Sequence, residues 1–295
     1  MKPLLHHFTE RQLAAALQDV AGGYIFHGPK GVGKATAARE LARQLNCRGD
    51  EGRVCTACRQ FASGSFPDFI EIRPEGRASI TIEQVRGLSH TLSLSPYYAA
   101  GSRVVMIDEA DALTVEAQNA LLKLIEEPPP RTIFILVSEN LESLLPTVCS
   151  RLATLYFSPV PTPEIADFLT SRHEVAPSEA ERVAELAAGA PGTALNLIRD
   201  EVVASGLKEI DESAQQALDM SLFDRLVMAK KLVDQKMDLE AWASRLQRIL
   251  LRHLASGDKA ADLVACQMVA LERFRRHLVA NVGPRVALER LMLEL

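Results

Sequence analysis

The sequence of 295 residues has few aromatic side chains and no long hydrophobic stretch. Phe, Trp and Tyr make up only 5% of the chain, so few rings are available to stack on nucleic-acid bases. No segment approaches the ~20 apolar residues of a membrane span, and residues 1–7 lack the apolar core of a signal peptide. We therefore expect a cytoplasmic protein without a membrane partner.

An excess of basic residues is also missing. The chain has 33 Lys and Arg against 38 Asp and Glu, a formal net charge of -5. A protein that binds DNA by itself gains affinity from cations that neutralise phosphates, so this balance argues against a free-standing DNA binder. With 47% hydrophobic residues, the chain is long enough for two or three domains.

Cysteines are few, and their number, five, is odd. In a chain of this length they do not describe a disulfide framework, so the clustered Cys47, Cys55 and Cys58 indicate a metal site or chance. Redox chemistry at Cys55 and Cys58 is the less favoured interpretation, because that motif belongs to a different βαβ setting. Cys149 and Cys266 have apolar neighbours in the sequence and are expected to be small core residues.

In the first half of the chain, short apolar runs alternate with segments of helical period, which predicts an α/β fold with a parallel sheet covered by helices. Thr81 with Gln84 forms a capping box, and Thr114 is expected to cap the helix that stops at Pro128. Strands are expected at residues 24–27, 68–72, 103–107, 132–137 and 154–157.

The second half of the chain has no recognisable strand. Three prolines between residues 159 and 163 interrupt the chain, and we place a domain boundary there. Ser178 with Glu181 forms a second capping box, whose helix is expected to end at Gly189. We predict an α/β domain at 1–159, a small helical domain at 160–206 and long amphipathic helices at 207–295.

Residues 28–34, GPKGVGK, follow a predicted strand and open a helix, which is the context of a phosphate-binding P-loop. Gly28, Gly31 and Gly33 let successive backbone N–H groups curve around phosphates. Lys34 reaches the terminal phosphates. The order of strand, loop, Gly-Lys and helix favours a nucleotide-binding loop over a glycine-rich turn without a ligand.

The residue that follows the P-loop lysine departs from the motif. A working loop has a Ser or Thr hydroxyl there to hold magnesium, but this chain has Ala35. Thr36 lies one position later, about 100° around the helix. Two interpretations stay open: the loop binds ATP without efficient turnover, or it is a relic that keeps only the shape. Magnesium is expected only if the nucleotide binds.

The apolar run at 103–107 ends in acidic residues, in the form of a Walker B segment. Asp108 would hold magnesium and Glu109 would polarise a water molecule. Acidic residues at a strand end can also simply face solvent, but the position downstream of a P-loop favours function. The string Asp-Glu-Ala-Asp also occurs in a helicase family, whose second motor domain and basic channel have no counterpart in this acidic, helical second half.

These motifs resemble the AAA+ ATPases and, more narrowly, the bacterial clamp-loader subunits of DNA polymerase III. The resemblance covers residues ~20–160 and implies a P-loop AAA+ core, a helical lid and a helical collar. Further segments that carry it are Leu45-Asn46-Cys47, Pro67-Asp68-Phe69-Ile70-Glu71-Ile72, Asn119-Ala120-Leu121-Leu122-Lys123-Leu124-Ile125-Glu126-Glu127-Pro128-Pro129 and Ser150-Arg151.

The family contains the motor subunits gamma and tau and the largely non-hydrolysing delta-prime subunit. Ala35 favours delta-prime, as does Thr193, which lies where the resemblance implies a phosphate-sensing arginine. A motor subunit is also expected to continue beyond 295 residues. Because Lys34, Asp108 and Glu109 remain, a gamma/tau-like ATP-hydrolysing subunit is the alternative, and slow hydrolysis by this chain stays open.

The resemblance also implies roles for two single residues. Arg151 lies near the family's Ser-Arg-Cys motif, with Leu152 in place of the cysteine, and would be a finger for a neighbour's ATP site; alternatively, it is a surface arginine that caps a loop. Ser138 fits the sensor 1 position that would detect the γ-phosphate, or it only caps the following turn.

A zinc module is implied at residues 47–58, whose ligands would be Cys47, Cys55 and Cys58. The family's module has four cysteines, and Gly52 falls where one ligand is missing. Because structural zinc prefers four ligands, Asp50, Glu51 or water would have to complete the site, or the site is degenerate.

The implied function is that of a subunit in a ring that opens the sliding clamp and places it on primed DNA. Its partners would be the gamma/tau and delta subunits, the clamp and, through the complex, primed DNA. A P-loop kinase for a small molecule is the alternative outside this family, but the helical second half offers no obvious acceptor pocket.

Overall fold

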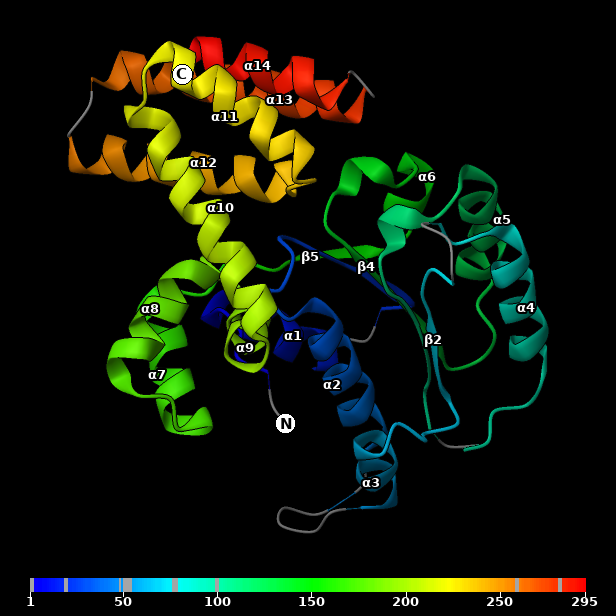
Figure 1. Cartoon of the computed structure of the whole chain (residues 1–295). Coiled ribbons are helices and arrows are strands. Elements are labelled where there is room, and N and C mark those ends of the chain that lie inside the picture. The colour runs from blue at the N-terminus through cyan, green and yellow to red at the C-terminus, as the bar shows by residue number, and fades with distance from the viewer. Residues whose placement is uncertain are drawn as a thin grey trace. The chain divides into compact units, whose positions relative to one another are not determined.

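The computed structural model of the chain describes residues 3–18, 21–47, 49, 55–75, 79–98, 101–257, 260–280 and 283–295, except for the side chains of 201–207 and 279. The chain divides into two compact units, Met1–Leu195 and Asn196–Leu295 (Figure 1). The finer division predicted at residues 159 and 206 stays a prediction.

The first unit is built on one sheet of five parallel strands, in the order β2-β3-β4-β1-β5. Every predicted strand is present within one residue of its expected bounds. The central strands β1, β3 and β4 are apolar and buried, as expected for parallel strands covered on both faces. The strands are β1 (Gly23–His27), β2 (Phe69–Ile72), β3 (Arg103–Ile107), β4 (Thr132–Ser138) and β5 (Ala153–Tyr156).

Helices cover both faces of this sheet. Successive strand residues point to opposite faces, so Phe26 packs in one core cluster with Leu41 of α2 (Lys34–Asn46). Ile25 packs in the other cluster with Leu121 of α5 (Val115–Glu126). The remaining elements of the first unit are α1 (His7–Gln18), α3 (Thr56–Ala62), α4 (Ile82–Ser93), η1 (Ala110–Ala112), η2 (Leu141–Ser143), α6 (Pro146–Cys149), α7 (Thr162–His173), α8 (Pro177–Ala187) and the start of α9 (Pro191–Arg199).

Two predicted helix starts are confirmed. The backbone N–H of Thr81 donates to Gln84 Oε1 at 3.0 Å at the start of α4, and Thr114 Oγ1 accepts from the backbone N–H of Ala117 at 3.2 Å at the start of α5. The predicted capping box at Ser178 is wrong. Helix α8 already begins at Pro177, which suits a first helical position because it has no N–H to satisfy.

The second unit consists of helices around a separate hydrophobic core. Trp242 is fully buried in this core, and its indole N–H donates to Ser213 Oγ at 3.1 Å. The helices are α10 (Glu201–Asp219), α11 (Leu222–Asp234), α12 (Leu239–Ser256), α13 (Ala261–Val279) and α14 (Pro284–Glu294).

The expectation that Cys266 is a core residue is wrong, since the residue is exposed. On α13 the buried positions share one face at helical spacing, and Cys266 lies off that face; they are Val264, Gln267, Ala270, Leu271 and Phe274. Cys149 is half-buried and packs against the core of the first unit.

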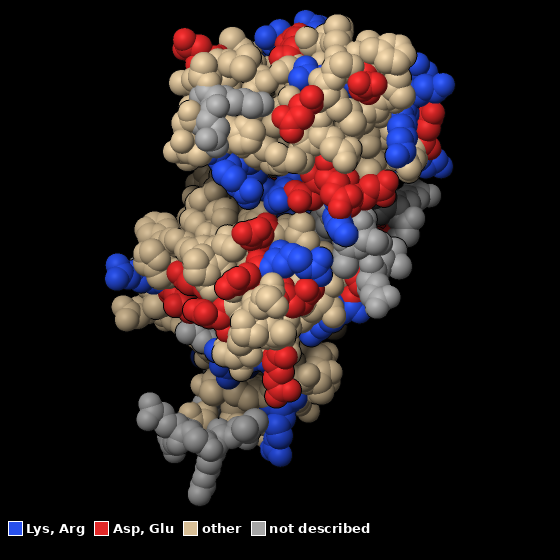
Figure 2. All heavy atoms as spheres, turned by 60° about the vertical axis from the view of Figure 1, so that its left-hand side comes forward, with Lys and Arg blue, Asp and Glu red and all other residues tan. Residues whose placement is uncertain are grey.

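Charges on the surface are mixed. On the face shown in Figure 2, acidic and basic side chains intermingle over the described surface, as a net charge of -5 leads one to expect. Among the helices that the structure describes, none has both the length and the apolar character that a membrane span requires.

Candidate functional site

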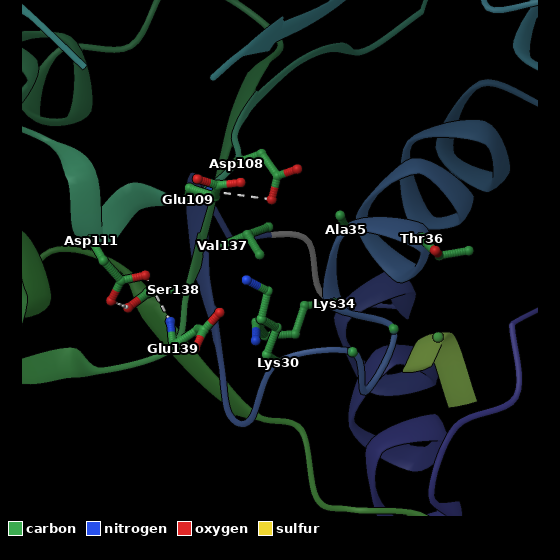
Figure 3. A pocket seen from close by; sticks show the side chains of 13 residues that line it. Lys30, Lys34, Ala35, Thr36, Asp108, Glu109, Asp111, Val137, Ser138 and Glu139 are labelled. Carbon is green, nitrogen blue, oxygen red and sulfur yellow. Dashed lines mark hydrogen bonds between the residues drawn. The ribbon is translucent and has the colours of Figure 1, made fainter. Parts of the chain in front are cut away.

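A cavity of about 240 Å³ lies where the P-loop faces the carboxyl ends of β3 and β4 (Figure 3). The carboxyl ends of parallel strands are the usual ligand-binding edge of such a sheet. Eight of the predicted site residues meet at this cavity; Gly28, Arg151 and the cysteines do not line it. The lining residues are Lys30, Gly31, Gly33, Lys34, Ala35, Thr36, Asp108, Glu109, Asp111, Val137, Ser138, Glu139 and Gly192.

The P-loop glycines are required by the backbone. Gly28 and Gly31 have φ angles of 145° and 78°, in the region that side-chain-bearing residues rarely adopt. A Cβ on Gly31 would also lie 2.5 Å from Thr193 Oγ1. The loop therefore has the conformation in which backbone N–H groups can surround phosphates, so the residues present fit a nucleotide.

Lys34 is the buried cation of the loop. Its Nζ donates to the carbonyl oxygens of Gly28 at 2.6 Å and of Pro29 at 2.8 Å. Burial lowers the pKa of Lys34, and the carboxylates of Glu139, Asp111 and Asp108 offset part of that effect. Figure 3 shows Lys34 and Lys30 directed toward the strand ends that carry these acidic groups.

Where a working P-loop presents a magnesium-binding hydroxyl, directly after Lys34, this cavity is lined by the methyl group of Ala35. Ala35 and Thr36 both line the cavity from the first turn of α2. In Figure 3, Ala35 faces the side of the cavity that carries Asp108, and Thr36 lies farther along α2. The hydroxyl of Thr36 is thus displaced from the place where a P-loop presents one.

The acidic end of β3 also borders the cavity. Asp108 is half-buried and accepts the backbone N–H of Glu109 at 3.2 Å, while Glu109 is exposed and has a left-handed φ of 53°. Both residues line the cavity that the phosphate-binding loop also borders. Their roles toward magnesium and water stay predictions.

Asp111 is a central residue of the site to which the sequence reasoning gave no role. Its carboxylate accepts four hydrogen bonds from the end of β4 and the segment after it, at 2.8–2.9 Å; the donors are Ser138 Oγ, Glu139 N, Asn140 N and Ser143 Oγ. Burial raises the pKa of Asp111, but these four hydrogen bonds outweigh it and hold the pKa below its usual range.

Ser138 is almost completely buried at the end of β4. Its hydroxyl lies 2.8 Å from Asp111 Oδ1 and 2.9 Å from the carbonyl oxygen of Asn140. Ser138 therefore lines the cavity while its hydroxyl is engaged with Asp111. The predicted sensor 1 role stays a prediction.

The segment at the start of α9 meets the P-loop directly. The backbone N–H of Gly192, near the start of α9, donates to the carbonyl oxygen of Gly31 at 2.8 Å. Because Gly192 also lines the cavity, the start of α9 forms part of its wall. The segment beside Thr193, where the resemblance implies a phosphate-sensing arginine, thus contacts the loop through the small residue Gly192.

Gln118 connects α5 to the segment that leads to Arg151. The side chain is buried; its Nε2 donates to the carbonyl oxygens of Leu113 and Ser143, and its Oε1 accepts the backbone N–H of Leu145 at 2.7 Å. Helix α6 begins directly after Leu145. A buried amide in an amphipathic helix is the signal that could have identified this residue.

Arg151 lies between α6 and β5, outside the cavity of its own chain. Its Nη2 pairs with Glu126 Oε1 at 2.6 Å, and its Nη1 donates to the carbonyl oxygen of Thr147 at 2.9 Å. The Arg151 side chain is 38% exposed. The arrangement leaves Arg151 at the surface, without a contact to its own P-loop.

The three clustered cysteines meet outside the cavity. The Sγ atoms of Cys47 and Cys58 lie 3.4 Å apart, those of Cys47 and Cys55 lie 4.0 Å apart, and all three are within 4.8 Å of one another. Tetrahedral zinc with Zn–S bonds of ~2.3 Å separates its ligands by about 3.8 Å. The cluster therefore fits three corners of a zinc site.

Arg43 adds a positive group beside this cluster. Its Nη1 lies 3.0 Å from Cys58 Sγ. Burial and the neighbouring thiols raise the pKa of the Cys58 thiol, and Arg43 opposes that shift. The proposed completing residues Asp50 and Glu51, and the position Gly52, lie outside the described residues.

Asp111→Asn should make the chain less stable in a pH-dependent way. An Asp whose pKa is lowered in the folded state stabilises the fold above its ordinary pKa of about 4, and this contribution disappears as the pH falls through the lowered value. We expect a loss of about 1–2 kcal/mol in the free energy of unfolding at pH 7, shrinking below pH ~4. Urea unfolding between pH 3 and 7 measures it.

The matched control is Asp167→Asn, which changes an exposed carboxylate on α7. It should leave the free energy of unfolding nearly unchanged at every pH. A loss for Asp111→Asn that stays constant from pH 7 to pH 3 would contradict the assignment.

Sequence comparison finds relatives among the subunits of DNA polymerase III. A family model described as "DNA polymerase III, delta subunit" matches residues 6–161. The delta' subunit of Pseudomonas aeruginosa is 32% identical over 82% of this chain and 76% of its own length. The tau subunit of Escherichia coli is 31% identical over 95% of this chain, which spans about half the length of that relative (47%).

Solved structures share the fold at low sequence identity. A gamma subunit-related protein of DNA polymerase III from Thermotoga maritima aligns with a TM-score of 0.50 and 19% identity over 97% of each chain. The Orc1 protein of Aeropyrum pernix, solved in complex with DNA, aligns with a TM-score of 0.50 and 17% identity over 85% of this chain and 79% of that one. The predicted AAA+ fold is confirmed. The chain belongs to the family described as DNA polymerase III, delta subunit, among the bacterial clamp-loader subunits.

Proposed function

We propose that this chain is a delta-prime-like subunit of the DNA polymerase III clamp loader. In this role it helps an AAA+ ring of gamma/tau and delta subunits to load the sliding clamp onto primed DNA. It donates Arg151 to the ATP site of a neighbouring subunit. The observation that carries the proposal is the otherwise complete P-loop cavity in which the magnesium-holding hydroxyl is the methyl group of Ala35.

The cavity supports a subunit that binds a nucleotide without efficient turnover. The P-loop backbone and Lys34 would hold the phosphates of ATP, and Asp108 would face a magnesium ion from the opposite wall. When bound, magnesium supplies charge neutralisation at the transferring phosphate. This chain offers one carboxylate for that ion but no hydroxyl directly after Lys34. We therefore expect it to bind ATP without hydrolysing it efficiently.

The trans role of Arg151 is supported by its place at the surface. It lies outside its own cavity, and its side chain is 38% exposed. An arginine that reaches a neighbour's phosphate stabilises the charge of the transition state. A subunit with a weak site of its own can therefore still contribute to ATP hydrolysis by the ring.

Arg151→Ala should lower the ATPase of the assembled complex and leave assembly intact. An arginine finger contributes about 10³-fold or more to the rate at the site that it completes. The ATPase rate of the complex should therefore fall by the share that the neighbouring ATP site contributes. Steady-state ATPase and gel filtration of the complex with its partner subunits measure the two effects.

Arg182→Ala is the matched control, because Arg182 is an exposed arginine of α8 that also pairs with a glutamate, Glu179. It should change neither ATPase nor assembly. Unchanged ATPase for Arg151→Ala in a complete complex would contradict the finger assignment.

The alternative is a gamma/tau-like subunit that hydrolyses ATP itself, and Asp108 and Glu109 at the cavity favour it. The two functions differ in magnesium-dependent turnover by the purified chain. A delta-prime-like chain should show no turnover above that of the Lys34→Ala variant. Turnover that Lys34→Ala abolishes would favour the motor subunit.

We also propose that Cys47, Cys55 and Cys58 hold one structural zinc ion, because their sulfur atoms fit three ligand positions.

The purified chain should contain about one zinc per chain, and Cys55→Ser should release it, because a structural site needs its thiolate ligands. Metal analysis and a chelator titration measure this. Cys266→Ser, at an exposed cysteine of the second unit, is the control that should keep the zinc. Zinc retained in Cys55→Ser, or no zinc in the unchanged chain, would contradict the site.

A further inference from the structure

We infer that Glu126 is the residue that positions Arg151 for its neighbour's ATP site. Glu126 is the last residue of α5, and its Oε1 lies 2.6 Å from Arg151 Nη2. The inference rests on the proposed function, since it concerns how the finger is held. It concerns a pair that is separated by 25 positions in the sequence and that joins α5 to the segment between α6 and β5.

The guanidinium is held from two sides. Besides Glu126, the carbonyl oxygen of Thr147 accepts from Nη1 at 2.9 Å, and Ser150 Oγ lies 3.3 Å from the same nitrogen. Arginine has five N–H donors in a rigid plane. Among the described residues, hydrogen bonds engage Nη1 and Glu126 lies against Nη2, while the Nε–H is left for a phosphate oxygen.

Both supports belong to anchored elements. In α5, Ala117 and Leu121 are fully buried, and Pro128 follows the end of the helix. In α6, Val148 is fully buried. Gln118 links the two elements, because its side chain accepts the backbone N–H of Leu145 at the start of α6. The backbone positions of Glu126 and Thr147 are therefore fixed relative to one another.

The ion pair is suited to orientation rather than to stability. The two side chains are 38% and 46% exposed, and exposed ion pairs contribute little to folding. A free arginine side chain samples many rotamers and loses that freedom when it meets a phosphate. A guanidinium that Glu126 already holds loses less rotamer freedom when it meets the phosphate, so the activation free energy is lower.

A glutamate beside a finger could instead compete with the phosphate for the guanidinium. The contact pattern favours positioning, because Glu126 approaches Nη2 while the Nε–H stays available, and because Thr147 fixes the opposite nitrogen. A competing acceptor would slow the reaction, and its removal would accelerate it. The two roles thus differ in the sign of the effect.

The test compares Glu126→Gln with Glu127→Gln in the assembled complex. Glu127 is the next residue and is exposed, so its variant changes the same charge one position away. Glu126→Gln should lower the kcat of the complex ATPase by about three- to ten-fold, with the KM for ATP within about two-fold, because only the orientation of a transition-state contact is lost. Glu127→Gln should leave both constants unchanged.

The double variant Glu126→Gln/Arg151→Ala separates positioning from any other effect. If Glu126 acts through Arg151, the double variant should have the kcat of Arg151→Ala alone. A further loss in the double variant, or a kcat that Glu126→Gln leaves unchanged or raises, would overturn the inference.

The Arg151→Ala complex distinguishes this inference from the proposed function. If Arg151→Ala leaves the ATPase unchanged, the finger itself is wrong, and the positioning of Arg151 is overturned with it. If Arg151→Ala lowers the ATPase while Glu126→Gln does not, only the role of Glu126 is wrong.

Discussion

The half-buried carboxylate of Asp111 holds the polar wall of the site together. It follows β3 by four residues and accepts hydrogen bonds from Ser138, Glu139, Asn140 and Ser143, which end or follow β4. Burying a charge is costly unless its hydrogen bonds are made, so the two strand ends have little freedom to separate. The P-loop faces this fixed wall across the cavity.

From this carboxylate, contacts continue to the surface where Arg151 lies. Ser143 contacts Asp111 through its hydroxyl and Gln118 through its carbonyl oxygen, and Gln118 in turn holds Leu145 before α6. The chain's own cavity and its surface arginine are thus supported by one connected set of polar contacts.

Local sequence patterns predicted the strands and the P-loop. They could not predict side-chain contacts between residues far apart in the sequence. The five strands are apolar runs between breakers, and the P-loop is a continuous motif, so both could be predicted from the sequence. Asp111 and Glu126 could not, because their partners lie 25 or more positions away. Ser178 was misplaced because Pro177 begins its helix, and Cys266 because apolar neighbours in the sequence do not share its helix face.

The central claim is that this chain serves the ring through its position and its arginine rather than through its own ATP site. The most direct measurement is the ATPase and clamp-loading rate of a complex in which only this chain carries Lys34→Ala. The account predicts both rates to be those of the unchanged complex, within about two-fold, since the removed ammonium serves a site that lacks its magnesium hydroxyl. A loss of most of the ATPase would contradict it and identify the chain as a motor subunit.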